Sequence, residues 1–147
     1  DILEKYFEAI VIIAGHPKIN YKNQTNLYGK REVLVGKTCE LIRDCQVVVS
    51  NGSTADNFAV LWRKPLLLVT TNEIENSVQK KFLDATANLL KTETINADDN
   101  LNTIDWHSLS QKPIANYDEF INKIIKKEGT SDENSWKILI DFLKKNV

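Results

Sequence analysis

The sequence predicts an α/β fold with a parallel sheet of about four strands, flanked by helices and followed by a helical carboxyl-terminal tail. Short, continuously apolar segments alternate with segments of helical periodicity, which is typical of parallel strands covered on both faces. Of the 147 residues, 42% are hydrophobic and 27% are charged, the ordinary balance of a globular domain with a core. The alternation stops near residue 96, and two further helical patterns follow it.

The amino-terminal segment changes its pattern without a turn. Residues 2–8 (ILEKYFE) have helical spacing, and the apolar run AIVIIA at 9–14 predicts a strand. No glycine, proline, asparagine or aspartate separates the two patterns, although a change of period normally requires a turn. We therefore expect residues to be missing between Glu8 and Ala9, or the domain to have been cut from a longer protein. The polar stretch 18–36 predicts a long loop.

Helices and strands then alternate regularly up to residue 96. Continuous apolar stretches predict strands, and apolar residues three or four positions apart predict helices. The expected elements are a helix at 38–44, a strand at 46–50, a helix at 54–63, a strand at 66–70, a helix at 76–90 and a short strand at 92–96. Residues 1–96 therefore form the predicted core domain, which is Rossmann-like in its alternation.

The carboxyl-terminal segment, residues 97–147, departs from this alternation. Residues 97–116 are polar and predict a loop in which Trp106 is a packing residue. Two helices are expected after it, at 118–127 and at 135–145, where Ser131 and Asn134 are plausible start signals for the second. We expect both helices to pack on the core or on an absent amino-terminal domain.

The last expected helix has two interpretations. Trp136 and the leucines that follow it have helical spacing, and the helix ends in Lys144 and Lys145. A basic amphipathic helix can bind a membrane surface, whereas a lysine-ended helix can also pack against protein. The basic cluster is smaller than the four to eight residues typical of lipid recognition, so we favour packing and expect Trp136 to be largely buried.

Composition and motifs exclude several classes of protein. The net charge of −1 gives no electrostatic case for nucleic acid as a partner. Cys39 and Cys45 lack metal-site spacing and suit reduced thiols, and no apolar run approaches the roughly 20 residues of a membrane span. Fingerprints for dinucleotide binding, the Walker loop and the hydrolase nucleophile elbow are absent. We expect no metal, no cofactor and a cytoplasmic protein.

Polar residues follow three of the predicted strands. His16 and Pro17 follow the first, the segment 51–54 follows the second, and Thr71 follows the third. In an open parallel sheet, ligands bind outside the carboxyl ends of the strands. We therefore expect these three ends to lie on one rim of one sheet, close enough for His16 and the segment 51–54 to share a small ligand.

The segment after the second strand, Asn51-Gly52-Ser53-Thr54, has two interpretations of its own. Gly52 permits a positive φ or a close approach of a ligand to the backbone. Ser53 and Thr54 fall at the start of the next helix, where free N–H groups and the helix dipole favour an anion. Ser53 followed by Asp56 also resembles a capping box. Both can hold together, because a hydroxyl can cap the helix and also meet a phosphate.

Three other polar residues have a structural alternative beside a functional one. Pro17 fixes the exit from the first strand, which would hold the His16 imidazole at the rim, although an isolated histidine is often structural. Lys30 and Arg31 could add positive charge to a site from the loop 18–36. Their alternative interpretation is a solvated loop.

The order of these segments resembles a known family. The stretches VIIAGHPKINY (11–21), YGKREVLVGKTCELI (28–42) and CQVVVSNGSTADNFAVLWRKPLLLVTT (45–71) are similar to the carboxyl-terminal half of bacterial surface-polysaccharide glycosyltransferases, which build capsule or lipopolysaccharide and have the GT-B architecture. The stretch SWKILIDFL (135–143) is similar to the terminal helix of such proteins. The resemblance spans most of the chain and consists of several short motifs.

The resemblance implies a donor-binding domain. In related families a His-Pro motif and a Ser-Ser or Ser-Thr motif hold the nucleotide-sugar, and they match His16-Pro17 and Ser53-Thr54 here. The donor would be CMP-, CDP- or UDP-linked and would bind without a divalent metal. The residues expected to contact the donor and its phosphate are His16, Pro17, Asn51, Gly52, Ser53, Thr54, Thr71 and Arg31.

The same resemblance places the catalytic base and the glycan acceptor on an absent amino-terminal domain. This chain alone would then be inactive, and the full protein would work in the cytoplasm, with peripheral association at the inner face of the membrane as one option. Its contribution to catalysis would be to stabilise charge on the departing nucleotide phosphate. Two alternatives remain open: a non-catalytic α/β module that binds a nucleotide or sugar as a regulator, and a purely structural domain with a capped turn.

Overall fold

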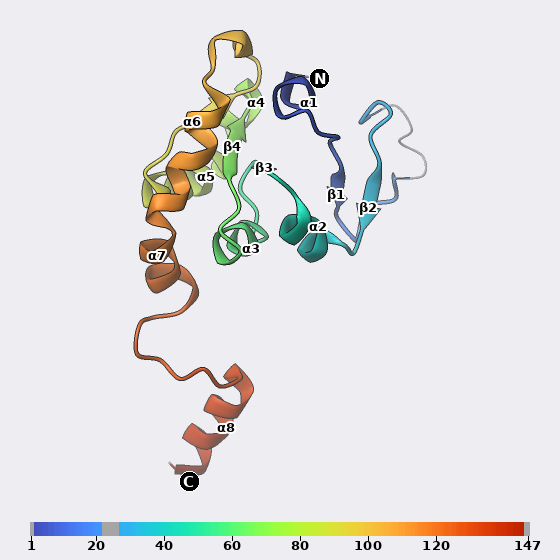
Figure 1. Ribbon diagram of the computed structural model, residues 1–147. Coiled ribbons are helices and arrows are strands. Elements are labelled where there is room, and N and C mark those ends of the chain that lie inside the picture. The colour runs from blue at the N-terminus through green and yellow to red at the C-terminus, as the bar shows by residue number, and fades with distance from the viewer. Residues whose placement is uncertain (1, 22–26, 146–147) are drawn as a thin grey trace.

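The computed structural model describes residues 2–21 and 27–145 and has the predicted α/β class (Figure 1). Its strands form two parallel sheets, one of two strands in the order β1-β2 and one of three in the order β3-β4-β5. The strands are β1 (Ile13–Gly15), β2 (Val33–Val35), β3 (Val48–Ser50), β4 (Leu66–Thr70) and β5 (Thr94–Asn96). The strands predicted for one sheet are divided between two in this structure, because β1 pairs with β2 and, within the described residues, does not pair with β3.

Helices cover the three-stranded sheet and continue to the carboxyl terminus. Three elements, α2, β4 and α8, begin and end at the predicted residues. The helical elements are α1 (Ile2–Phe7), α2 (Thr38–Asp44), α3 (Asp56–Leu61), α4 (Asn72–Glu75), α5 (Val78–Leu90), η2 (Leu101–Thr103), α6 (Trp106–Gln111), η3 (Lys112–Asn116), α7 (Tyr117–Phe120), η4 (Ile121–Ile125) and α8 (Ser135–Lys145).

The core lies on both faces of β4. Side chains alternate along a strand, so Leu66 and Leu68 point to one face and Leu67 points to the other. The first face packs against α2, α3, α5 and α7, and the second packs against α1 and α6. All three leucines are at most 1% exposed, and each buried leucine stabilises the fold by about 1.5–3 kcal/mol. Trp106 is 4% exposed, which confirms its prediction as a packing residue.

The chain turns between α1 and β1 at Glu8. This residue has a φ of 48°, in the left-handed region, and the Ala9 amide donates to the Glu4 carbonyl at 3.2 Å. Leu3 and Phe7 of α1 pack on the three-stranded sheet. The turn therefore occurs without a glycine at the position where the sequence pattern changes, and the predicted missing residues stay a prediction.

Three predicted boundaries need correction. The apolar run 9–14 becomes a strand only from Ile13, where the chain first meets β2, and Ile10 is 82% exposed. The predicted loop 18–36 contains β2, while residues 22–26 of it lie outside the described residues. The predicted loop 97–116 contains α6, whose start is capped by Asp105.

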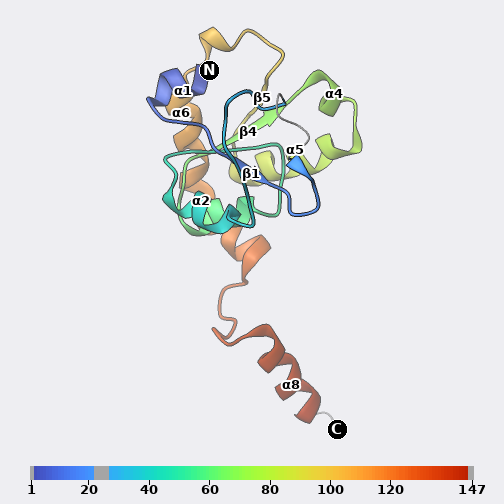
Figure 2. The same ribbon diagram turned by 90° about the vertical axis from the view of Figure 1, so that its right-hand side faces the viewer.

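The carboxyl-terminal helix α8 stands away from the sheets in both views (Figures 1 and 2). Every residue of α8 is at least partly exposed, and Trp136 is 73% exposed. The prediction that Trp136 is largely buried is wrong for this chain. Helical spacing defines an apolar face, but burial requires a second element against that face. No helix within residues 2–21 and 27–145 is both long and apolar enough to cross a membrane.

Candidate functional site

Three strand ends meet at the carboxyl edge of the larger sheet. Ser50 lies beside Leu68, and Thr70 lies beside Asn96, so the segments that follow leave the sheet at the same edge. We call these segments, Asn51–Thr54, Thr71–Asn72 and Ala97–Asp98, the polar edge. This is the place where an open parallel sheet binds its ligands.

The turn after β3 is held by two hydrogen bonds of Ser53. The Ser53 amide donates to Oδ2 of Asp56 at 3.1 Å, and the Ala55 amide donates to Oγ of Ser53 at 3.2 Å. Only half of the predicted capping box is therefore present: Asp56 accepts from the Ser53 amide, but the Ser53 hydroxyl accepts from Ala55, and α3 begins after Ala55 without a side-chain cap. The same contacts fix the backbone of the segment 51–54 before any ligand binds.

Gly52 is required by its backbone conformation. Its φ is 92°, which side-chain-bearing residues rarely adopt, and its amide donates to Oγ of Ser50 at 3.2 Å. A Cβ atom added to Gly52 would lie 3.7 Å from Leu83, an ordinary contact distance. The glycine therefore serves the turn, and crowding is not the reason for it.

Asp56 is a buried carboxylate beneath this turn. It is 4% exposed, and its burial raises its pKa, against the effect of hydrogen bonds from the Ser50 hydroxyl and the Ser53 amide. Tyr117 is fully buried, and both its burial and the charge of Asp56 raise the pKa of its phenol. Asp56 therefore positions the turn from inside the protein and is shielded from a ligand.

Ser53 and Thr54 retain hydrogen-bond donors at the exposed side of the turn. The Ser53 hydroxyl accepts from Ala55, which leaves its hydrogen free to donate to a ligand. Within residues 2–21 and 27–145, neither the amide nor the hydroxyl of Thr54 donates to a partner, and Thr54 is exposed. Two neighbouring residues therefore present donors to solvent.

The ends of β4 and β5 are joined by side-chain amides. The Asn72 amide donates to Oδ2 of Asp98 at 2.8 Å, and Nδ2 of Asn96 donates to Oδ1 of Asn72 at 2.9 Å. The Asp98 amide donates to Oδ1 of Asn96 at 3.0 Å. Asn72 follows a predicted strand and was expected at the rim, whereas Asn96 and Asp98 were not predicted as site residues. The signal that could have found them is their position at the end of β5 and just after it.

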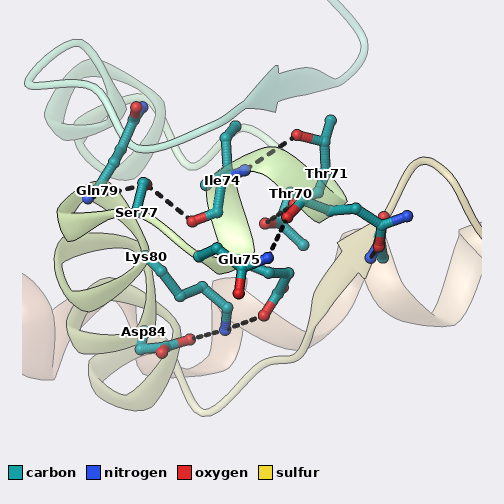
Figure 3. Close-up of polar contacts among 11 residues, drawn as sticks. Thr70, Thr71, Ile74, Glu75, Ser77, Gln79, Lys80 and Asp84 are labelled. Atoms are coloured by element: carbon teal, nitrogen blue, oxygen red, sulfur yellow. Dashed lines mark hydrogen bonds and ion pairs between the residues drawn. The ribbon is translucent and has the colours of Figure 1, made fainter.

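The segment after β4 runs into α4 and α5 (Figure 3). Oγ1 of Thr71 accepts from the Ile74 amide at 3.3 Å and so caps α4. Lys80 lies between Asp84 and Glu75, and its hydrogen bond to Asp84 raises its pKa. This lysine is engaged by two carboxylates, so it does not supply free positive charge to the polar edge.

His16 and Pro17 lie after β1, in the two-stranded sheet. The His16 amide donates to the Tyr21 hydroxyl at 2.7 Å, and Nδ1 of His16 accepts from the Lys18 amide at 3.2 Å. These contacts form a local turn, and the His16 side chain is exposed. The structure therefore brings Thr71 and the segment 51–54 to one sheet edge, but it places His16 and Pro17 on another sheet.

Arg31 is engaged by a carboxylate of α1. Its Nε lies 3.0 Å from Oε1 of Glu4, and its Nη2 lies 2.6 Å from Oε2. The guanidinium holds the pKa of Glu4 down at about 2. Arg31 thus ties α1 to the segment before β2, and a phosphate would have to compete with Glu4 for it. Lys30 is exposed, as expected for a loop residue.

Metal-binding chemistry has no visible basis in the described part of the chain. There, no three histidine, cysteine, aspartate or glutamate side chains gather into a group that could hold a metal ion. Cys39 is an exposed free thiol and Cys45 a partly buried one, and burial raises the pKa of Cys45.

Comparison with known proteins identifies no similar protein. No family model matches the chain, and neither the curated proteins nor the solved structures contain a significant match.

Proposed function

We propose that this chain is the donor-binding half of a glycosyltransferase for bacterial surface polysaccharide, and that the polar edge binds the phosphate of a CMP-, CDP- or UDP-linked sugar. The observation that carries the proposal is the turn after β3. Asp56 holds it rigidly from below, while Ser53 and Thr54 keep exposed donors at the edge where parallel sheets bind ligands. The motif resemblance assigns the same pair to the donor.

The chemistry of the turn suits a phosphate oxygen. Hydroxyl and amide groups donate to an anion in charge-assisted hydrogen bonds, which are stronger than neutral ones. The dipole of α3 adds little, because the helix has six residues. Arg31 and Lys80 are already paired with carboxylates. With donors that are mainly neutral, we expect micromolar to millimolar dissociation constants, or roughly −8 to −4 kcal/mol.

The proposed role in catalysis is to stabilise the departing nucleotide. Charge develops on the phosphate as the bond between the sugar's anomeric carbon and the phosphate oxygen breaks and the acceptor hydroxyl forms the new glycosidic bond, and preorganised hydrogen-bond donors lower the barrier for that step. The catalytic base and the acceptor site belong to a partner domain in this proposal. The isolated chain would therefore bind the donor without turning it over. The full protein would act in the cytoplasm, at or near the inner face of the membrane.

Isothermal titration of the chain with CMP, UDP and inorganic phosphate tests the proposal. We expect a nucleotide to bind more tightly than phosphate. Thr54→Val removes the hydroxyl at nearly constant shape and should weaken nucleotide binding on the order of tenfold, equivalent to about 1.4 kcal/mol. Thr130→Val, in the exposed segment before α8, is the matched control and should bind as the parent does.

Two results would overturn the proposal. One is equal affinity for phosphate and nucleotides, which would leave the turn with a purely structural role. The other is unchanged nucleotide binding in Thr54→Val. Turnover of a nucleotide-sugar by the chain alone would contradict the assignment of the catalytic base to a partner domain. Binding without any transferase activity in the full-length protein would favour the regulatory alternative.

A further inference from the structure

Among residues 2–21 and 27–145, one edge of β1 and one edge of β3 are unpaired and have matching backbone groups. The Val48 amide donates to the Pro65 carbonyl at 2.8 Å, so the backbone of Val48 faces β4. Backbone groups alternate along a strand, and Val49 therefore directs its N–H and C=O to the opposite, unpaired edge of β3. By the same alternation, Ala14 faces the open edge of β1, because the Ile13 amide donates to the Glu32 carbonyl at 2.8 Å.

Helix α2 already lies where a continuous sheet would place it. Ile42 of α2 packs in the same core cluster as Val60 of α3 and Leu83 of α5, so the three helices share one face of the sheet. Right-handed crossovers that run in one direction across a sheet place their helices on one face. Helix α2 therefore lies on the face that the helix of such a crossover would occupy, although the structure assigns β2 and β3 to different sheets.

We infer that β1 pairs in parallel with the open edge of β3 and joins the two sheets into one, in the order β2-β1-β3-β4-β5. This is one of the common orders of doubly wound α/β sheets. Open strand edges invite pairing, and Val49 at the middle of β3 is 46% exposed. Pairing satisfies the edge groups of both strands and covers this valine.

The backbone alternation restricts the register. With Ala14 and Val49 as the edge donors, Ile13 can lie opposite Val49 while Ala14 lies opposite Ser50. This register leaves the turn hydrogen bond of the His16 amide intact. A register shifted by one residue would turn the backbone groups of one strand away from the other.

Pairing also has a consequence for the polar edge, and this part rests on the proposed function. The switch point of the joined sheet lies between β1 and β3, where doubly wound sheets bind their ligands. His16 and Pro17 would then leave the sheet beside the segment Asn51–Thr54. A nucleotide that contacts both ends binds the joined form more tightly and shifts the population toward it.

A pair of cysteines reports on β1–β3 pairing. The background is Cys39→Ser with Cys45→Ser, and the reporter adds Ile13→Cys with Val49→Cys. Neighbouring strands lie about 4.8 Å apart, within the Cα separations of disulfides. The matched control combines Ala14→Cys with Val49→Cys, in which alternation places the two sulfurs on opposite faces of the joined sheet. Circular dichroism and thermal unfolding of the reduced proteins establish that both variants fold.

Under mild oxidation we expect the reporter to form an intramolecular disulfide on the order of tenfold faster than the control, a preference of about 1.4 kcal/mol. Equal rates in the two variants, or no disulfide in the folded reporter, would overturn the inference. Disulfide-linked dimers whose yield rises with protein concentration would also overturn it, because a second copy would then occupy the β3 edge.

The same reporter separates this inference from the proposed function. We expect CMP or UDP to increase the rate of disulfide formation. Nucleotide binding without β1–β3 pairing would refute the inference and leave the proposed function standing. Pairing in a chain that binds no nucleotide would refute the proposed function alone. A rate of disulfide formation that does not change when a nucleotide binds would refute the coupling between nucleotide binding and β1–β3 pairing.

Discussion

Tyr117 offers the sharpest test of how the carboxyl-terminal segment is attached to the core. Its side chain is fully buried, and its hydroxyl donates to the carbonyl of Lys64 at 2.7 Å. Lys64 lies directly before β4 in the chain, after α3, whereas Tyr117 begins α7. The hydrogen bond therefore joins elements that are 53 residues apart. Tyr117→Phe removes the hydroxyl and keeps the ring in the core.

The expected loss of stability follows from the two groups involved. A typical intramolecular hydrogen bond contributes about 0.5–1.5 kcal/mol, and an unsatisfied buried acceptor costs about 1–3 kcal/mol. Because the Lys64 carbonyl loses this donor, we expect Tyr117→Phe to lower the free energy of unfolding by about 1–2 kcal/mol. Loss of the ring in Tyr117→Ala should cost about 3–5 kcal/mol, the range of large-to-small core changes.

Urea denaturation followed by fluorescence measures these differences. The midpoint should fall for Tyr117→Phe while the slope of the transition stays constant, since the compactness of the chain is unchanged. Tyr6→Phe is the matched control, because Tyr6 is 46% exposed and its ring contact with Phe7 survives the change. We expect the control to lie within about 0.5 kcal/mol of the parent. A Tyr117→Phe midpoint equal to that of the control would refute the attachment through Lys64.

Three further predictions concern charge and exposure. Burial raises the pKa of Asp56 in the folded state above its pKa in the unfolded state, so the parent loses stability as pH rises from the unfolded pKa to the folded pKa. Asp56→Asn should flatten this pH dependence, which urea midpoints measured at acid and neutral pH will show. Arg31 lowers the pKa of Glu4 from 4.5 to about 2, so the stability that Glu4 contributes is present above pH 4.5 and is lost as pH falls toward 2. Glu4→Gln should be less stable than the parent at neutral pH and equally stable at low pH. A stability difference that stays constant across this pH range would contradict the ion pair. Trp136 is 73% exposed, so Trp136→Ala should change the free energy of unfolding by no more than about 0.5 kcal/mol, and a larger loss would mean that α8 packs on the protein.

Local patterns predicted much of the fold. The helix Thr38–Asp44, the strand Leu66–Thr70 and the helix Ser135–Lys145 have the expected bounds, because each carries its full periodicity within its own residues. The loop predictions failed where an element depends on a partner. Val33–Val35 is a strand because β1 lies beside it. Asp105 caps the helix that begins at Trp106. The prediction of a polar loop at 97–116 did not use this capping signal.

Part of the candidate site was predictable, because some of its residues directly follow strands that local patterns predict. Ser53, Thr54 and Thr71 follow strands that the sequence predicts, so their place at one edge of a sheet could be expected. The contact of Asp56 with the Ser53 amide was visible in their spacing, and the burial of Asp56 was not. Asn96 was overlooked as a contact residue, because its role depends on Asn72, which lies 24 residues away.

The sequence by itself determined the α/β class, the central strand β4, and the contact between the Ser53 amide and the Asp56 carboxylate, because each follows from side-chain periodicity or from groups a few residues apart. Only the tertiary structure decided which strands share a sheet and which apolar faces are covered. Strand pairing joins backbone groups that are chemically alike in every residue, so the amino-acid pattern does not name the partner of β1 or β3. Burial likewise needs a second surface, which is why Trp136 faces solvent although its helix has an apolar face.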